Sequence, residues 1–278
     1  MSATSITLDS PARADVARGR VTQLRVIRSE WTKLWSLRST RWTLLVAILG
    51  MAGLGPLVAA VQMNRWNHMG LDDRLHFNAI NTGLGGYHFA QLAIGVLGVL
   101  VLTGEYSTGQ IRSTFMAVPK RLPVLWAKAG VFAVVGFALM LPTVLIAFFG
   151  SQAILRSQDI LQISFSHPGV ARTVIGGAVY LMLIGVFALG LGAIVRNTAG
   201  GIALFAAIMF VIPPLLNILP SDWYDAINPY LPSTAGDAIF SLTHGSDTLA
   251  PWPGFFLFLG YTALSIGIAA VLLVRRDT

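Results

Sequence analysis

The chain contains no cysteine and few charged residues. Without cysteine it can form neither a disulfide framework nor a thiolate metal site, and it has no cysteine nucleophile. Charged residues make up 11% of the 278 residues and hydrophobic residues 55%, whereas a soluble domain carries about 25% charged residues. Disordered chains combine low hydrophobicity with high charge, which is the opposite of this composition. So few polar groups cannot cover a globular surface in water, and most of the chain must be surrounded by lipid.

Six long apolar runs follow the first 41 residues. A helix needs about 20 apolar residues to cross the hydrocarbon core of a bilayer. Pro142 lies inside the third run and predicts a kink or an early end there. The sequence predicts an all-α membrane protein with six transmembrane helices, at residues 42–62, 84–104, 124–149, 172–195, 198–219 and 253–274.

The basic residues are distributed unevenly between the connections. Fifteen of the 19 Lys and Arg residues lie in four segments, residues 1–41, 105–128, 196–197 and 275–278. The positive-inside rule predicts that these segments, with both termini, lie on the cytoplasmic side of the plasma membrane. The net charge of +7 therefore reflects topology, and no nucleic acid is expected as a partner. The expected organisation is a flexible N-terminus (1–20), an amphipathic interfacial helix (21–41), the transmembrane domain (42–274) and a tail (275–278).

Acidic residues are missing from the centres of the expected spans. Only Glu105 lies even at the edge of one. Ion-coupled transporters need a buried ionisable group for the proton or cation. This absence argues against a secondary transporter and against an enzyme with intramembrane carboxylates, so another chain is expected to supply the driving energy.

Residues 21–41 have the pattern of a basic amphipathic helix. Apolar side chains recur at intervals of three and four, which places them on one helical face: Leu24, Ile27, Trp31, Leu34 and Leu37. Basic side chains occupy other positions, and tryptophan is typical of the headgroup layer. We expect a helix that lies in the membrane interface. A solvated helix with no role beyond topology is the alternative.

Residues 105–122 separate the second and third spans. Ser107 and Gln110 have the spacing of a capping box, and Pro119 excludes a longer helix, which predicts a short helix over about residues 107–118. An apolar edge of that helix is formed by Ile111, Phe115 and Val118. This edge either binds a partner or packs on the inner ends of the protein's own spans.

Glu105 lies at the C-terminal end of the second expected span. A carboxylate there faces the negative end of the helix dipole, which is unfavourable. It either pairs with Arg112 or Lys128, as a structural residue, or joins the helix ends to a moving partner.

Four stretches follow one another along the chain: SEWTKLWSLRSTRWTLL, TGEYSTGQIRSTFMAVPKR, LGLGAIVRNTAGGIAL and ILPSDWYDAINPYLPSTAGDAI. Through them the chain, from about residue 22 to 274, resembles the ABC-2 type permeases of ATP-binding cassette transporters, most closely those of actinobacterial drug-export systems. The resemblance implies a type V exporter fold: an amphipathic connecting helix, a cytoplasmic coupling helix between spans two and three, and short extracellular helices between spans five and six. It implies an exporter of hydrophobic or amphipathic substrates.

The resemblance also implies partners and sites. The expected partners are two ATPase subunits, a second permease subunit (a copy or a homologue), the lipid bilayer and an accessory membrane subunit. The expected contacts with the ATPase are Glu105, Ser107, Gln110, Ile111, Arg112, Phe115, Val118 and Arg196. An extracellular gate is expected at Trp223, Tyr224, Tyr230 and Asp237, in a segment where Ser221 and Ser233 could cap two short helices. The alternative is a loop that only seals the outer end.

No phosphate-binding G-x-x-x-x-G-K-[ST] motif is present, so ATP and Mg would belong to the separate ATPase subunits, and no cofactor is expected in this chain. A membrane scaffold or sensor with this fold is an alternative function. A polytopic enzyme is a weaker one, since neither G-x-S-x-G nor H-E-x-x-H occurs. No metal site is expected, because the spacing of His68, Asp72, Asp73 and His76 matches no zinc signature.

Small residues form two stripes on the last spans. Ala199, Ala203 and Ala207 share a face of the fifth span, and Ala263 and Gly267 share a face of the sixth. Such faces allow helices to approach closely. They serve either packing within one subunit, which we expect, or a seam between two permease subunits.

Overall fold

The computed structural model describes residues 22–275 except 69, 71, 73, 75–76, 158–162, 243–244 and 246–247. The described residues form helices and no strands. The longer helices are α1 (Gln23–Ser36), α2 (Arg38–Arg65), α5 (Tyr87–Ser107), α7 (Leu122–Arg156), α8 (Val170–Val195), α9 (Thr198–Ala206) and α13 (Pro251–Arg275). The shorter ones are η1 (Trp66–His68), α4 (Ala79–Leu84), α6 (Gln110–Ala117), η2 (Ala207–Val211), α10 (Ile212–Leu216), α11 (Ser221–Ile227), η3 (Asn228–Tyr230), α12 (Pro232–Asp237) and η4 (Ala238–Phe240).

Among the described residues, six helical segments are long and apolar enough to cross a membrane. They are Arg38–Arg65, Ala79–Ser107, Leu122–Arg156, Val170–Val195, Thr198–Leu216 and Pro251–Arg275. The predicted number and positions of the spans are therefore confirmed, although several helices extend beyond the apolar runs by a turn or more. The chain has the character of a multi-pass membrane protein.

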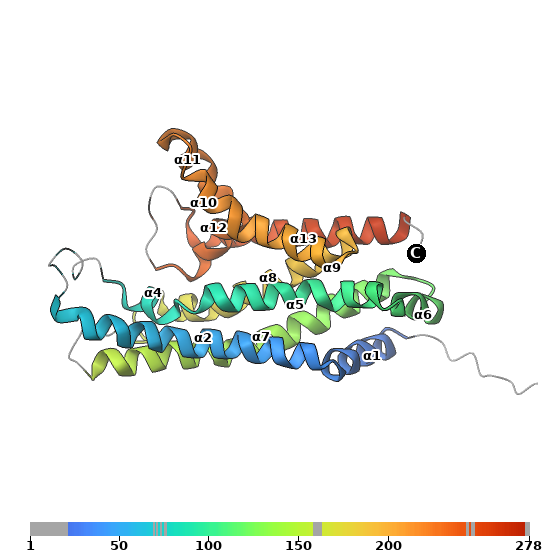
Figure 1. The fold of residues 1–278 in the computed structure, drawn as a ribbon, viewed down its shortest axis with the longest axis horizontal. Helices are drawn as coiled ribbons and strands as arrows, with labels where there is room; N and C mark the ends of the chain where they lie inside the picture. The colour runs from blue at the N-terminus through green and yellow to red at the C-terminus, as the bar shows by residue number, and fades with distance from the viewer. Residues whose placement is uncertain are drawn as a thin grey trace, which may run out of the picture.

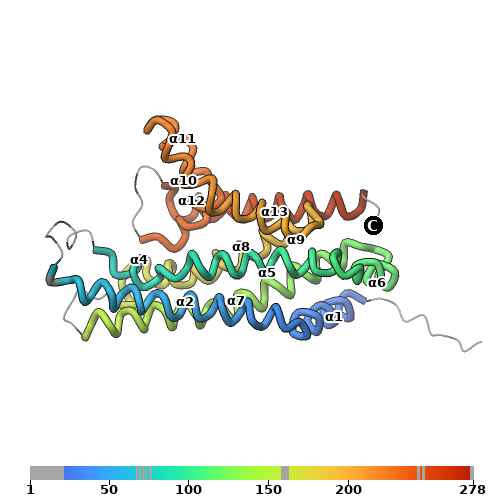
Figure 2. The backbone as a smooth tube through the Cα atoms, in the orientation of Figure 1, coloured from blue at the N-terminus to red at the C-terminus, as the bar shows by residue number. Residues whose placement is uncertain are grey.

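Helix α8 is the most buried of the six and lies against α5, α7 and α13 (Figures 1 and 2). Glycines bring these helices together. A Cβ atom on Gly98 would lie 2.2 Å from the carbonyl oxygen of Gly185, and one on Gly190 would lie 2.4 Å from Oγ of Ser265. Such distances are too short for any side chain, so glycine is needed where α8 crosses α5 and α13.

Prolines affect the third and fifth spans differently. Helix α7 continues through Pro142, which excludes the early end, one of the two alternatives predicted there. In the fifth span, Pro213 and Pro214 have no N–H to donate to carbonyls one turn earlier. The preceding segment, η2, is a π-helix, and the N–H of Ile212 donates to the carbonyl of Ala207. Such π segments are rare and occur mostly as single turns within α-helices.

The two ends of the bundle differ (Figure 1). Helices α1 and α6 and the C-terminal end of α13 lie together at one end, which we call the charged end, and Arg196 in the α8–α9 turn hydrogen-bonds to the last turn of α13 there. Helices α4, α11 and α12 lie at the opposite end. The segments that the charge count grouped together, as far as they are described, thus lie on one side of the bundle.

The predicted single helix over residues 21–41 is divided at Leu37. Leu37 has an extended backbone, so α1 ends at Ser36 and Arg38 already begins the first span. The face that α1 buries carries Val26, Glu30 and Leu34. Of the predicted apolar face only Leu34 is buried, while Leu24, Ile27, Trp31 and Leu37 are exposed.

The two stripes of small residues also lie outward. Ala199, Ala203, Ala263 and Gly267 are exposed, and nothing lies within 4 Å of a Cβ atom built on Gly267. Packing within one subunit, the use expected for these stripes, does not occur at these positions.

Candidate functional site

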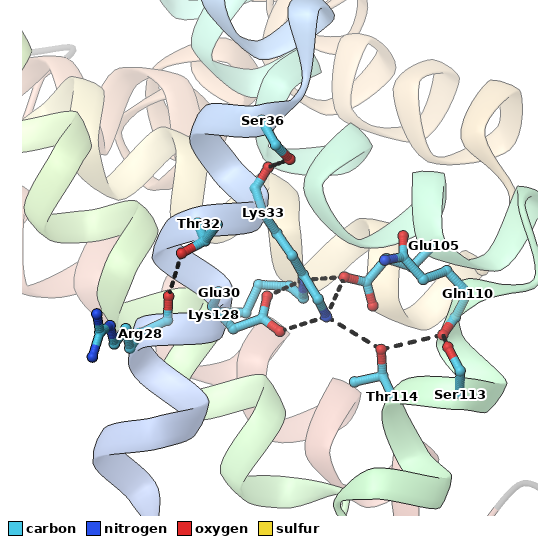
Figure 3. Close-up of polar contacts among 10 residues, drawn as sticks. All are labelled: Arg28, Glu30, Thr32, Lys33, Ser36, Glu105, Gln110, Ser113, Thr114 and Lys128. Carbon is cyan, nitrogen blue, oxygen red and sulfur yellow. Dashed lines mark hydrogen bonds and ion pairs between the residues drawn. The ribbon is translucent and has the colours of Figure 1, made fainter.

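Four charged side chains from three helices meet at the charged end (Figure 3). Helix α1 supplies Glu30 and Lys33, α5 supplies Glu105, and α7 supplies Lys128. Lys33 Nζ lies 2.8 Å from Glu30 Oε1 and 3.0 Å from Glu105 Oε1. Lys128 Nζ lies 2.9 Å from Glu105 Oε1 and also donates to Glu30 Oε2. We call these four residues the charged cluster.

Most of the charged cluster is withdrawn from solvent. The exposed fractions are 3% for Lys128, 4% for Glu30 and 7% for Glu105, while the side chain of Lys33 is about a quarter exposed. A buried charge is tolerated only when it is paired, and here each lysine contacts both glutamates. Burial lowers the pKa of Lys33, but the hydrogen bonds and charges of Glu30 and Glu105 outweigh burial and raise it overall. The cluster is a neutral set of two acids and two bases.

Helix α6 is attached to this cluster. Lys33 Nζ donates to Thr114 Oγ1 over 3.2 Å, so Lys33 joins α1, α5 and α6 (Figure 3). Glu105 pairs with Lys128, one of its two expected partners, and no ion pair with Arg112 is formed among the described residues.

The apolar edge of α6 faces the bundle. Ile111 and Phe115 are buried in the main core and Val118 packs against it, so packing on the protein's own inner ends is what the structure has. Ile111 and Phe115, expected to contact the ATPase, are therefore not surface residues of this chain. The exposed residues of α6 are Gln110, Arg112, Ser113, Met116 and Ala117, of which Met116 is 77% exposed.

The predicted capping box is absent. Gly109 with φ of 72° precedes α6 instead, a conformation that favours glycine, and no side chain caps this helix. Ser107 belongs to the end of α5, where its hydroxyl donates to the carbonyl of Gly104. The helix covers Gln110–Ala117 and so begins later than expected, because Gly109 makes the turn.

Two arginines hold the end of α13. Arg196 donates to the carbonyl of Leu272 over 3.1 Å, and Arg121 donates to that of Leu273 over 3.0 Å. The guanidinium of Arg196 also lies over the ring of Tyr106, 5.4 Å from its centroid. Cations are favourable at a helix C-terminus. Arg196, expected to contact the ATPase, thus binds the sixth span and the end of α5.

The four expected gate residues differ in exposure. Short helices do join the last two spans, but the α11 residue Trp223 and the η3 residue Tyr230 are exposed, Tyr224 is half-buried, and Asp237 faces the interior. The backbone carbonyl of Tyr230 accepts a hydrogen bond from the hydroxyl of Tyr261 on α13.

The expected helix caps in this segment are wrong. No side chain caps α11 or α12, because Ser221 and Ser233 lie inside the first turns of these helices rather than before them.

Asp237 is a buried carboxylate at the opposite end. Its Oδ2 accepts a hydrogen bond of 3.1 Å from the hydroxyl of Tyr87, whereas Oδ1 is buried and has no hydrogen-bond partner among the described residues. Burial raises the pKa of Asp237 to about 7, an effect that hydrogen bonding to the carboxylate only partly opposes. This carboxylate is bound by the Tyr87 hydroxyl and has no ion pair in the described part of the chain.

A pocket of about 210 Å³ lies beside the charged cluster, between α1, the start of α2, α5 and α7. We call it the α1–α5 pocket. Glu105 and Lys128 line it, and Leu97, Leu100 and Val101 of α5 form much of its apolar wall. Sequence reasoning missed this pocket because it did not identify Glu30. The one available signal was that Glu30 is the only acidic residue between positions 21 and 41.

The described residues contain no group of three or more His, Asp or Glu side chains that could hold a metal ion. Of the four residues His68, Asp72, Asp73 and His76, Asp73 and His76 lie outside the described residues. No family model matches this chain, and no curated protein matches it.

Proposed function

We propose that the chain is the permease subunit of an ATP-driven exporter of the ABC-2 type. It would move a hydrophobic or amphipathic substrate out of the cytoplasm or the inner leaflet, with ATP and Mg bound by two separate ATPase subunits. Six helices that can cross a membrane and the four family-like stretches support this function. The observation that carries it is the charged cluster, which links one short helix to three long ones.

The link is mechanical. A subunit that pushes on α6 moves Thr114, and Lys33 connects Thr114 with Glu105 on the second span. Lys128 then connects the same carboxylate with the third span. Separating buried, paired charges costs a large amount of free energy. The charged cluster therefore stays together when α6 moves, and passes the movement to α5 and α7.

The exposed face of α6 is the proposed ATPase contact. Arg112, Ser113 and Met116 on α6 point away from the core, and Arg28 on α1 is exposed at the same end. These residues take the place of Ile111 and Phe115, which the bundle itself buries. The charged end is then cytoplasmic, in agreement with its excess of basic residues.

A second permease subunit is part of the proposal. The fifth and sixth spans are poorly covered in the single chain, and their exposed small residues offer a close-packing face for a copy or homologue of this chain. The segment from α11 to η4, at the opposite end, is the proposed extracellular gate, with Trp223 and Tyr230 at its surface and Asp237 at its base.

The experiment that tests this function uses a photo-crosslinking amino acid in living cells. At Met116 it should capture a protein that binds ATP, as shown by azido-ATP labelling of the crosslinked band. The control position is Ile218, which is 80% exposed and lies beyond α10, toward the opposite end. It should capture no ATP-binding protein. Capture from Ile218 instead of Met116 would reverse the proposed orientation, and capture from neither would exclude α6 as the contact.

The same complex separates transport from a scaffold or sensor role. An exporter should hydrolyse ATP faster when its substrate is present and should accumulate that substrate in inside-out vesicles. A scaffold would bind the ATPase without either effect.

A further inference from the structure

The α1–α5 pocket contains a buried acceptor without a donor. Oε1 of Glu105 accepts hydrogen bonds from both Lys33 and Lys128. Oε2 of the same carboxylate is buried and accepts none from the described residues, although Glu105 is only 7% exposed. Buried polar atoms almost always have a partner, and leaving a charged acceptor unpaired is costly.

None of the donors on the pocket walls reaches this oxygen, although Gln110 and Lys128 also line the pocket. A serine or threonine hydroxyl has one proton, and those of Ser36, Ser107 and Thr108 already donate to backbone carbonyls over 2.9 to 3.0 Å. The three N–H groups of Lys33 go to Glu30, Glu105 and Thr114. Oε2 and these three hydroxyl oxygens therefore have lone pairs that a ligand with N–H or O–H donors would satisfy.

One side of the pocket is apolar, and the pocket is of limited size. Leu97, Leu100 and Val101 line one side, and the volume is about 210 Å³. An apolar cavity of roughly 150 Å³ holds one benzene molecule. The pocket therefore accommodates a ring or a short alkyl chain beside the polar atoms.

We propose that the α1–α5 pocket binds a primary ammonium group carried on an apolar body, such as an arylalkylamine. The ammonium donates to Oε2 of Glu105 and to the oxygens of Ser107 and Thr108, and the apolar part lies against Leu97, Leu100 and Val101. A charge-assisted hydrogen bond to a carboxylate is stronger than a neutral one. Both lysines bind Oε1 of Glu105, so the ligand ammonium binds Oε2, the oxygen without a partner. The negative charges of Glu30 and Glu105 offset the positive charges of the two lysines.

The ammonium can come from two sources. A free amphiphilic amine supplies it directly, and the headgroup of phosphatidylethanolamine supplies the same three donors at the charged end. This site exists independently of the proposed transport function, and its test uses neither ATP nor an ATPase.

The test measures equilibrium binding of radiolabelled 4-phenylbutylamine to the full chain in phosphatidylcholine nanodiscs, corrected with empty nanodiscs. Two analogues remove one property each. The alcohol 4-phenylbutan-1-ol has no charge, and the N,N,N-trimethyl derivative keeps the charge without N–H donors. We expect both to bind at least about tenfold more weakly than the amine, since a hydrogen bond to a charged group contributes about that factor. These measurements need no variant and do not depend on its folding.

Two variants locate the site. Leu100→Trp should fill the apolar side and weaken amine binding at least about tenfold, whereas Leu92→Trp, an outward-facing leucine of the same helix, should leave it unchanged. Glu105→Gln should also weaken binding, and should abolish the preference for the amine over the alcohol.

The lipid arm replaces part of the phosphatidylcholine with phosphatidylethanolamine. Competition with the probe would identify the lipid headgroup as a source of the ammonium, and its absence would leave free amines. The proposal is overturned by any of three results. These are no saturable binding below about 1 mM, equal affinity for the amine and the trimethyl analogue, or equal binding by the Leu100→Trp and Leu92→Trp proteins.

Discussion

Two buried carboxylates, one at each end of the bundle, are stabilised in different ways. Glu105 at the charged end contacts two ammonium groups, whereas Asp237 at the opposite end is bound by a tyrosine hydroxyl and has no cation against it in the described part of the chain. The first arrangement is strong and fixes three helices relative to one another. The arrangement around Asp237 raises the pKa of this carboxyl group to about 7, so that it is partly protonated near neutral pH. One end is therefore suited to transmitting movement and the other to responding to its surroundings.

The largest loss of stability should appear at the charged end, when one lysine of the charged cluster is removed. Lys128→Met leaves Glu30 and Glu105 buried with Lys33 alone, and should lower the free energy of unfolding by about 3–5 kcal/mol. Denaturant unfolding in detergent measures it. Lys120→Met is the matched control, because Lys120 is exposed, and it should change stability little. Equal effects of the two substitutions would mean that the cluster does not hold the helices together.

A smaller effect is expected at the opposite end. Arg172 donates to the carbonyls of Ile239 and Ser241 over 2.8 and 3.0 Å, and so fixes the end of η4 to α8. Arg172→Met should cost about 1–3 kcal/mol and increase proteolytic cleavage near residues 238–242. Arg156→Met, at an exposed arginine, serves as the control. Unchanged cleavage in the Arg172 variant would show that the segment is held by its apolar contacts alone.

Asp237 should make stability depend on pH. The folded chain keeps its proton up to about pH 7, whereas an unfolded aspartate loses it near pH 4, so the folded state binds more protons between these values. Stability must then fall as pH rises from about 4 to 7 and level off above, with a loss of about 1 kcal/mol between pH 6 and pH 8. Asp237→Asn should flatten this profile. A profile that is the same in both proteins would place the titration elsewhere.

Orientation can be measured without any change in stability. The chain has no cysteine, so single cysteines can be placed at the exposed positions Ser113 and Ser157, on α6 and after α7. An impermeant thiol reagent applied to intact cells should label Ser157→Cys and not Ser113→Cys. Labelling of Ser113→Cys alone would put the charged end outside the cell.

The sequence predicted the spans and their grouping because both depend on simple, additive quantities. The spans follow from long runs of apolar residues, and their grouping follows from the number of Arg and Lys residues in each connection. Neither prediction requires knowledge of how side chains pack. The faces of short helices could not be predicted in this way. Exposure of Leu24, Ile27 and Trp31 is compatible with the helix expected in the membrane interface. The spacing of apolar residues did not indicate that α1 turns Glu30 inward to two lysines.

Pairing across the sequence was the other missing information. Glu30 and Lys128 are separated by 98 positions, and nothing local to either indicates the other. The edge of Ile111 and Phe115 was recognised as apolar, yet whether it meets a partner or the bundle depends on how α6 folds back against the long helices. Asp237 was predicted as a gate residue from the sequence, but its partner Tyr87 lies 150 positions away and could not be predicted.

The proposed coupling depends most on the contact between Lys33 and Thr114, through which α6 reaches the spans. Thr114→Val keeps the shape of the side chain and removes the hydroxyl that Lys33 contacts, while Ser113→Ala removes a neighbouring hydroxyl that bonds only within α6. ATP hydrolysis and substrate uptake should be measured together in inside-out vesicles containing the complex. We expect Thr114→Val to keep ATP hydrolysis and to lose transport several-fold, with Ser113→Ala unchanged in both. If Thr114→Val transports as well per ATP as the unaltered protein, the charged cluster does not couple α6 to the membrane helices.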